Sequence, residues 1–292
     1  MPPRWFSHTI GKGARSGFCM SGGVQLHFLA WNPEAVEKPA LIFVHGYRAH
    51  AHYWDFIAPF FLDCFRVIAL DLAGMGDSSS RSEYSAEGFA RDITALIEQA
   101  DLSPATVVGH SFGGARALRA AAERPELIAR VVALDSICRF PDGDEPQPLQ
   151  RPARLVIYPD FATARARFRL VPAQPCANEF LLQHVARHSL RQDQGGWRWK
   201  FDPALPAGPR EPDAAEFLER IQAPVHYVRG QHSKVVSSKL ALRIVHHLKL
   251  GEGPIIIPGA YHYLMLDQPL ALIAMLRELM GKEPAFIPRD EP

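Results

Sequence analysis

Short apolar runs recur along the chain, and polar or helix-forming segments separate them. Continuous runs of this kind are typical of strands buried on both faces of a parallel sheet, whereas Val24 to Trp31 alternates and predicts a half-exposed strand. The apolar runs are Ala40 to His45, Phe65 to Leu72, Ala105 to Val108, Ala129 to Leu134, Pro224 to Gly230 and Pro254 to Ile257. Strands and helices that alternate in this order predict an α/β fold with a right-handed, mostly parallel sheet and helices on both faces.

Segments with helical spacing lie between these runs. Ser85 is a suitable N-cap for a helix that continues to Gln99, because its hydroxyl can accept a backbone N–H of the first turn. Further helices are predicted at Ala115 to Glu123, at Lys239 to Leu248 and at Pro269 to Met280, and Tyr53 to Leu62 has roughly helical spacing as well.

The amino-acid composition changes between residues 139 and 215. This segment is rich in proline, arginine and glutamine, contains no buried-strand run, and has helical pieces near Phe161 to Phe168 and Asn178 to Leu190. An insertion between two strands of an open sheet is well placed to cover the crevice where such sheets bind ligands. We therefore predict a core formed by residues 1–138 and 216–292 and a helical cap, or lid, formed by residues 139–215.

Composition and charge narrow the class of protein. The 292 residues are 47% hydrophobic and 22% charged, with a formal net charge of +1, so nothing favours a nucleic-acid or membrane partner. The four widely spaced cysteines are interpreted as reduced thiols. No secretory signal and no membrane-spanning run is expected, and together these features predict a cytoplasmic, monomeric or homodimeric protein that acts on a small molecule.

The stretch Val107 to Gly114 matches G-x-S-x-G through Gly109, Ser111 and Gly113. It follows an apolar β-branched run and precedes an alanine-rich helical segment. In this context the motif predicts a nucleophile elbow, a strained turn between strand and helix that exposes the hydroxyl of Ser111 above the sheet. The alternative is a chance Gly-Ser-Gly loop.

The chain resembles the α/β-hydrolase superfamily over nearly its whole length. The resemblance rests on the elbow and on His45-Gly46, Asp71 to Ser78 and Gly259 to His262, each of which follows a predicted strand. Two segments of the insertion, Arg167 to Leu170 and Gly195 to Asp202, are similar to bacterial relatives that have no assigned substrate. The resemblance implies an eight-stranded sheet with an inserted cap, and it assigns the oxyanion hole to the backbone N–H groups of Tyr47 and Phe112.

His262 is the candidate base for Ser111, because it follows the last strand in the chain order nucleophile, acid, histidine. Many relatives carry the acid after the seventh strand, but Lys234 occupies that position here, and a cation cannot orient an imidazole through its N–H. Asp135, which ends the sixth strand, is the predicted substitute, with a purely structural role as the alternative. Asp267 is expected to start the final helix, and Asp71 and Asp77 are expected to be structural.

Other residues are weaker candidates for substrate contacts or for a metal site. We expect His45, Gly46, His110, Trp197 and Leu264 to contact the substrate, although Trp197 could instead pack the lid on the core. His184 and His188 stand four residues apart but lack the glutamate of H-E-x-x-H, and His45, His50 and His52 fit a pocket rim better than a ligand cluster. We therefore predict no metal and no cofactor.

Three functional classes remain open. The first, which the motifs favour, is a cofactor-independent serine hydrolase that cleaves a small carboxylic ester or a related acyl bond, such as a thioester or an activated carbon–carbon bond, through an acyl-enzyme at Ser111. The second is another reaction on the same scaffold, for example that of a lyase or perhydrolase. The third is a weakly active or non-catalytic ligand-binding relative, and Lys234 is its main support.

Overall fold

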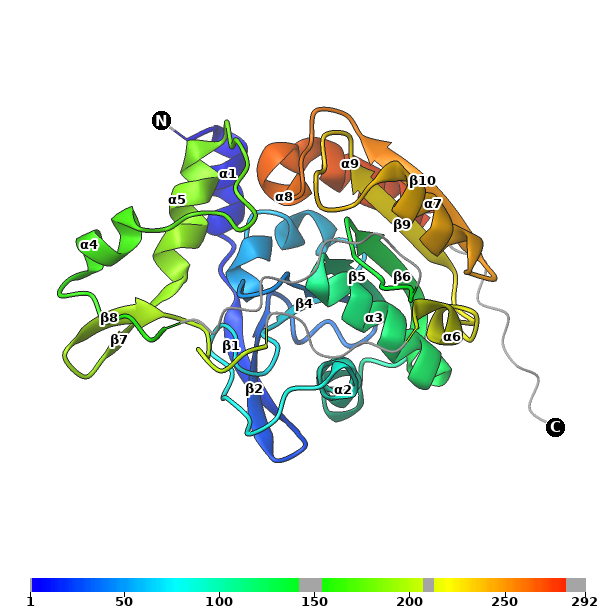
Figure 1. The fold of residues 1–292 in the computed structure, drawn as a ribbon, viewed down its shortest axis with the longest axis horizontal. Helices are drawn as coiled ribbons and strands as arrows, with labels where there is room; N and C mark the ends of the chain where they lie inside the picture. The colour runs from blue at the N-terminus through cyan, green and yellow to red at the C-terminus, as the bar shows by residue number, and fades with distance from the viewer. Residues whose placement is uncertain (1, 142–153, 207–212, 282–292) are drawn as a thin grey trace.

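An eight-stranded sheet forms the centre of the molecule (Figure 1). The computed structural model describes residues 2–141, 154–206 and 213–281. The strand order is β1-β2-β4-β3-β5-β6-β9-β10, in which β1 (Arg15–Ser21) and β2 (Val24–Ala30) are antiparallel to their neighbours and the others are parallel. The parallel strands are β3 (Ala40–Val44), β4 (Arg66–Leu70), β5 (Ala105–His110), β6 (Ile128–Leu134), β9 (Val225–Gly230) and β10 (Gly251–Ile257). The predicted mostly parallel eight-stranded sheet is confirmed.

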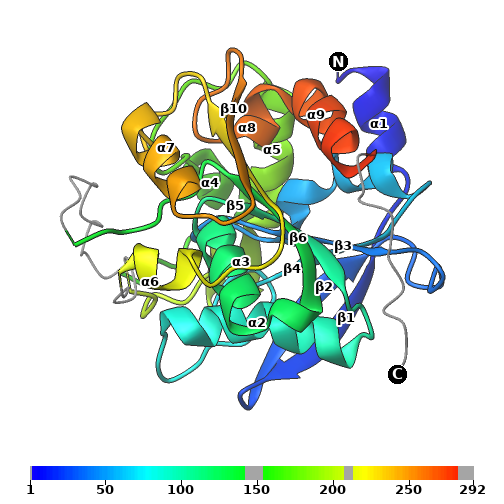
Figure 2. The same cartoon turned by 90° about the vertical axis from the view of Figure 1, so that its right-hand side faces the viewer.

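Helices lie on both faces of the sheet (Figure 2), and each face packs against its own hydrophobic cluster. Along β3, Ile42 and Val44 face one cluster while Leu41 and Phe43 face the other, as the alternation of side chains along a strand requires. The first cluster includes residues of α2 (Ala86–Gln99), α3 (Phe112–Glu123), α6 (Ala214–Leu218) and α7 (Ser238–His246). The second includes residues of the 3₁₀ turns η1 (Ala51–Trp54) and η2 (Ala58–Phe61), of α8 (Leu264–Asp267) and of α9 (Pro269–Gly281). None of the helices within the described ranges is both long and apolar enough to cross a bilayer.

The local predictions were mostly correct. The Ser85 hydroxyl accepts the N–H of Gly88 at 3.0 Å, so the predicted N-cap of α2 is confirmed. The helical spacing of Tyr53 to Leu62 was misleading, because that segment forms η1 and η2 instead of a continuous helix. Pro59 explains the interruption, since it has no N–H for a helical hydrogen bond. The sequence reading also missed α1 (Arg4–Ile10) and β1.

The segment predicted as a helical cap contains a hairpin in addition to helices. Its described part holds α4 (Phe161–Ala166), α5 (Glu179–His188) and a separate two-stranded antiparallel sheet of β7 (Leu190–Asp193) and β8 (Gly196–Trp199). These elements lie together on one side of the molecule in Figure 1. Residues 142–153 and 207–212 of the predicted cap lie outside the described residues.

The helix α6 belongs with the core. It begins at Ala214, inside the segment predicted as cap, but Ala214, Phe217 and Leu218 are buried in the first hydrophobic cluster. Two residues of this core-packed helix, Ala214 and Ala215, thus lie inside the segment predicted as cap.

Candidate active site

Ser111 lies on a sharp turn between β5 and α3. Its backbone has φ 52° and ψ −116°, a left-handed conformation that L-residues rarely adopt, and such strain is common at functional sites. The turn tolerates no side chain on its flanks. A Cβ on Gly109 would lie 2.5 Å from Gly114 Cα, and a Cβ on Gly113 would lie 2.4 Å from the carbonyl oxygen of His45. The glycines of the motif are thus required by close backbone approach, as a nucleophile elbow demands.

His262 and Asp135 are hydrogen-bonded to each other. His262 Nδ1 lies 2.7 Å from Asp135 Oδ2, and because a carboxylate only accepts, Nδ1 carries the proton. Asp135 is fully buried directly after β6, with a backbone φ of 46°. Its carboxylate also accepts the Ser233 hydroxyl at 2.6 Å and the Gly230 N–H at 3.2 Å. These bonds fix the carboxylate, which leaves Nε2 as the ring nitrogen of His262 that can exchange a proton.

Lys234 takes no part in this network. The residue is exposed, while its neighbour Ser233 is buried and holds Asp135. The family resemblance implies a carboxylate on the loop after β9. This loop instead contributes the hydroxyl of Ser233, which binds Asp135. Ser233 was missed because nothing in its sequence context distinguishes it from a surface serine.

The loop that carries His262 is anchored by three further residues. His110 Nε2 donates to the carbonyl oxygen of His262 at 2.8 Å, and the two rings lie 4.8 Å apart. Burial, and then the charge of nearby His262, lowers the pKa of His110 well below its usual value, so its ring is neutral. Asp267 accepts the N–H of Tyr261 at 2.7 Å, and Gln174 bonds both Asp267 and the N–H of Tyr263. Asp267 therefore ends α8 and fixes the histidine loop, whereas the sequence predicted that it starts the final helix.

Two backbone N–H groups are available beside the nucleophile. Phe112 is the first residue of α3, and neither its N–H nor that of Tyr47 has an acceptor within the described part of the chain. A Cβ on Gly46 would lie 3.5 Å from Ser111 Cβ, so the chain that leads to Tyr47 passes directly against the elbow. The rings of Tyr47 and Phe112 lie 5.7 Å apart. The predicted oxyanion residues thus flank Ser111 from two separate segments.

Among the described residues no hydrogen bond joins Ser111 to His262. Catalytic hydrogen bonds are often long before a substrate binds and shorten only in its presence. The contacts between His110 and His262 nevertheless place the histidine loop next to the residue that precedes the nucleophile.

A pocket of about 260 Å³ lies between the core and the α4–β8 region. Tyr47, next to the elbow, and Tyr263, next to His262, line it together with aromatic side chains of the inserted segment. Its lining also includes Arg48, Arg167, Arg169 and Lys200, and none of the described residues that line it is acidic. A second pocket of about 480 Å³ is lined by His262 itself, together with Ser233, Lys234 and the prolines Pro172 and Pro175. Ser111 lines neither pocket; His262 lines the second, and the first is lined by Tyr47, whose ring packs on Phe112, and by Tyr263, the neighbour of His262.

None of the five residues predicted to contact the substrate lines the first pocket. Both ring nitrogens of His45 are used within the protein: Nδ1 bonds Gly46 O at 2.7 Å, and Nε2 accepts the Leu72 N–H at 3.1 Å. Trp197 packs on Phe161 at 4.9 Å, and Leu264 is fully buried. Gly46 and His110 contact each other behind the elbow. Their sequence neighbours line the pocket instead, namely Tyr47, Arg48, His50, Trp199 and Tyr263.

Among the described residues, two groups of side chains are close enough to be considered for a metal ion. In the first, Asp71 is buried and its oxygens already accept His27 Nδ1 at 2.8 Å, Ala51 N at 2.6 Å and Asp77 N at 2.9 Å. This saturated carboxylate organises the loops after β4, in agreement with the structural role expected for it. The second group, His52, Asp55 and His188, joins the core to the inserted segment.

Comparison with known proteins identifies the class of protein. The family model described as the alpha/beta hydrolase fold matches residues 39–201, more than half of the chain, and the chain therefore belongs to the α/β-hydrolase family. Its relatives make it a hydrolase, and at family level a serine-type ester hydrolase.

Two named enzymes illustrate this similarity. The chain is 28% identical over 270 residues to esterase Rv0045c of Mycobacterium tuberculosis, which covers 86% of this chain and 85% of the relative. A crystal structure of that esterase superposes with a TM-score of 0.75 over 96% of this chain and 99% of the other, at 24% identity. The 2-(acetamidomethylene)succinate hydrolase of Mesorhizobium japonicum is 29% identical over 244 residues, or 79% of this chain and 84% of the relative.

Proposed function

We propose that the protein hydrolyses a carboxylic ester through an acyl-enzyme on Ser111, with His262 as general base and Asp135 as the acid that orients it. The observation that carries this proposal is the 2.7 Å hydrogen bond between His262 Nδ1 and the buried Asp135 carboxylate. The bond fixes the tautomer that leaves Nε2 free to accept a proton. Asp135 thus supplies the interaction that Lys234 cannot supply.

The reaction has two steps. Ser111 Oγ attacks the ester carbonyl while His262 takes its proton, and the negative charge on the carbonyl oxygen is stabilised by the N–H groups of Tyr47 and Phe112. When the tetrahedral intermediate collapses, the alcohol leaves with the proton held by His262. A water molecule, deprotonated by His262, then attacks the acyl-enzyme and releases the acid and free Ser111.

The inserted segment 139–215 acts in this proposal as a cap that provides the outer wall of the substrate pocket. Its residues Phe168, Leu170 and Trp199 give the pocket an apolar wall opposite Tyr47 and Tyr263. Pockets that combine apolar walls with a few polar groups are typical of small-molecule sites.

A fluorophosphonate probe tests the reaction class. The probe phosphonylates a serine only where a base and an oxyanion hole activate it. We expect one adduct per chain, located at Ser111 by peptide mass spectrometry, and we expect heat-denatured protein to stay unmodified. Folded protein that fails to react at Ser111 would instead favour the alternative function, a ligand-binding relative without activity.

The charge of the pocket favours an ester that carries a negative charge at a distance from the reacting bond. Four cationic side chains and no acidic one line the pocket, and of these Lys200 is paired with Asp77. Arg167 is exposed, and its guanidinium group forms no hydrogen bond or ion pair with another described residue. A carboxylate or phosphate on the substrate would find partners in the arginines of this pocket. A related hydrolase is named for a succinate, which is a dicarboxylate.

Arg167→Gln tests this substrate class. For an ester with a terminal carboxylate we expect KM to rise roughly fivefold, which corresponds to about 1 kcal/mol for a charge-assisted contact that solvent partly screens. The neutral ester of the same length should keep its KM. Arg165→Gln is the matched control, because Arg165 lies on the same helix but contacts Phe161 and not the pocket. Equal effects on the charged and the neutral ester would contradict the assignment.

A further inference from the structure

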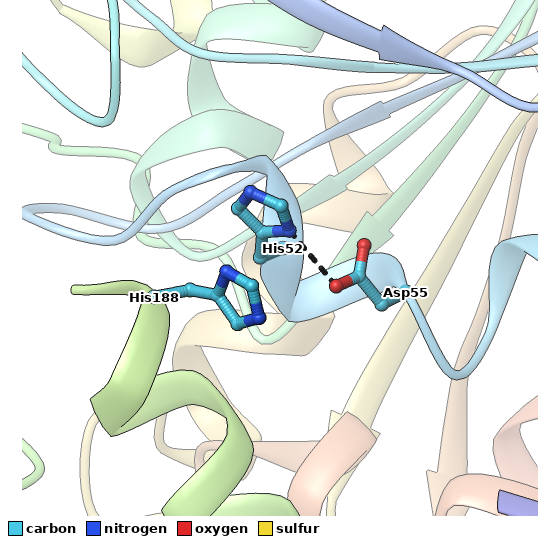
Figure 3. Close-up of side chains that lie close together, drawn as sticks. All are labelled: His52, Asp55 and His188. Carbon is cyan, nitrogen blue, oxygen red and sulfur yellow. Dashed lines mark hydrogen bonds and ion pairs between the residues drawn. The ribbon is translucent and has the colours of Figure 1, made fainter. Parts of the chain in front are cut away.

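Three histidines and one aspartate gather where α5 meets the core, away from Ser111. Figure 3 shows the rings of His52, from η1, and His188, at the end of α5, lying beside each other with the Asp55 carboxylate to one side. His52 Nδ1 is 2.9 Å from Asp55 Oδ2, and the two imidazole rings are 3.9 Å apart. A nitrogen of each ring and an oxygen of Asp55 all lie within 4.8 Å of one another.

A fourth side chain, that of His184, also binds the Asp55 carboxylate. His184 lies one helical turn before His188 on α5, and its Nε2 donates to Asp55 Oδ2 at 2.8 Å. The side chains of His52, Asp55 and His184 are 20%, 14% and 11% exposed, so the group is largely shielded but reachable from solvent. Carboxylates that bind a metal ion are commonly held by a further hydrogen bond, here that of His184.

The imidazole of His188 has no hydrogen-bonding role among the described residues. Its ring stacks on His52 and lies 4.7 Å from His184, but it forms no hydrogen bond within the described chain. Its ring nitrogen that lies within 4.8 Å of an Asp55 oxygen and a His52 nitrogen is of a type that binds transition metals. The saturated carboxylate of Asp71 offers the contrasting case, because all its contacts are internal.

We propose that His52, Asp55 and His188 form a binding site for a divalent transition-metal ion, of which Zn²⁺ is the best match. Two imidazoles and one carboxylate, with a fourth position left for water, are ligands that Zn²⁺ accepts in tetrahedral geometry. Bonds of about 2.0–2.2 Å to the metal place neighbouring ligand atoms roughly 3.3 Å apart. Small side-chain rotations of His52 and His188 bring the three donors to this separation, and the ion replaces the proton on His52 Nδ1.

One charge nearby opposes the ion. Lys200 is close enough to influence the charge of His52 and His188. Its ammonium group is paired with Asp77, which reduces this repulsion.

The site would join two parts of the structure beside the substrate pocket. His52 and Asp55 belong to the core, whereas His188 ends α5 of the inserted segment. The next residue, Ser189, lines the pocket and bonds His50 Nε2 at 2.9 Å. A bound ion therefore fixes one wall of the pocket to the core, and it should raise Tm and alter KM more than the reactivity of Ser111 toward a small probe.

Cobalt substitution tests the site without relying on activity. The full chain, stripped with a chelator, is titrated with Co²⁺ and followed by visible absorption, because four-coordinate Co²⁺ absorbs far more strongly than the hexaaqua ion. We expect strong bands that saturate at one Co²⁺ per chain and disappear when Zn²⁺ displaces it. Isothermal titration calorimetry with Zn²⁺ gives the affinity.

The variants separate this site from adventitious binding. His188→Ala and His52→Ala should each abolish the bands, and His184→Gln should weaken Zn²⁺ about 10- to 100-fold, as expected for a residue that supports a ligand. His8→Ala, which changes an exposed histidine on α1, is the matched control and should bind as the unaltered chain does.

Two results would overturn the proposal. The first is an unaltered chain that gives only the weak spectrum of hexaaqua Co²⁺, and this result needs no variant to fold. The second is a spectrum that persists unchanged in both His52→Ala and His188→Ala. Fluorophosphonate labelling of Ser111 is measured in parallel, so a failure of the metal site is distinguishable from a failure of the proposed hydrolysis.

Discussion

Ser111→Ala is expected to lower kcat for ester hydrolysis by about 10⁶-fold, the loss seen when the nucleophile of a serine triad is removed. Without Oγ no acyl-enzyme forms, and only the oxyanion hole and substrate binding remain to assist attack by water. The fold should be preserved, because alanine lacks only the hydroxyl and the backbone bond from Ser111 N to Leu134 O, 2.8 Å long, is unchanged.

The measurement is kcat for a chromogenic ester, with circular dichroism to verify folding. Ser103→Ala serves as the control, since Ser103 is exposed and its hydroxyl contacts only the Glu126 carbonyl. Turnover close to that of the unaltered protein in Ser111→Ala would remove Ser111 from the mechanism.

Asp135→Asn is expected to reduce kcat by roughly 10⁴-fold while the protein remains folded. The amide is nearly isosteric and still accepts from Ser233 and Gly230 through its oxygen. The amide of the variant can present its NH₂ group to His262 Nδ1. That nitrogen then has to accept a hydrogen bond, so the proton of the ring moves to Nε2. In this tautomer Nε2 cannot act as a base.

Lys234→Ala is the decisive companion variant. Lys234 occupies the position where the family resemblance implies an acid, but it is exposed and outside the His262–Asp135 network. We expect kcat to stay within about twofold of the unaltered protein, the range of surface substitutions. Reduced turnover in Lys234→Ala combined with full turnover in Asp135→Asn would reverse the assignment. Circular dichroism verifies that both variants are folded.

Much of the architecture follows from the sequence because strand burial has a simple pattern. The run that becomes β3 is uninterrupted and those that become β4 to β6 are largely apolar. The glycines around Ser111 indicate a steric demand that the structure shows as short distances from a Cβ built at each of them. The same holds for Asp135 and His262, since the ends of parallel strands meet at one edge of a sheet. The contact between them was predictable because each directly follows a strand or its loop.

The pocket walls were not predictable in this way. Side-chain direction in loops and hairpins depends on tertiary packing, so Trp197 and Trp199, two residues apart, receive different partners. His45 was expected to meet the substrate, yet its ring holds the loops at Gly46 and Leu72. The proximity of His52 and His188 was equally hidden, because 136 residues (188 minus 52) separate them and nothing local couples η1 to α5.

The origin of Asp135 on the strand next to the nucleophile has a mechanical consequence. Ser111 and Asp135 end the neighbouring strands β5 and β6, which share a continuous ladder of pairs from Thr106 with Arg130 to His110 with Leu134. Ser111 and Asp135 are therefore held in place by the same pair of hydrogen-bonded strands. His262 comes instead from the loop after the edge strand β10, so its alignment with the other two residues depends on the side-chain bonds of His110, Asp267 and Gln174 and not on the ladder between β5 and β6.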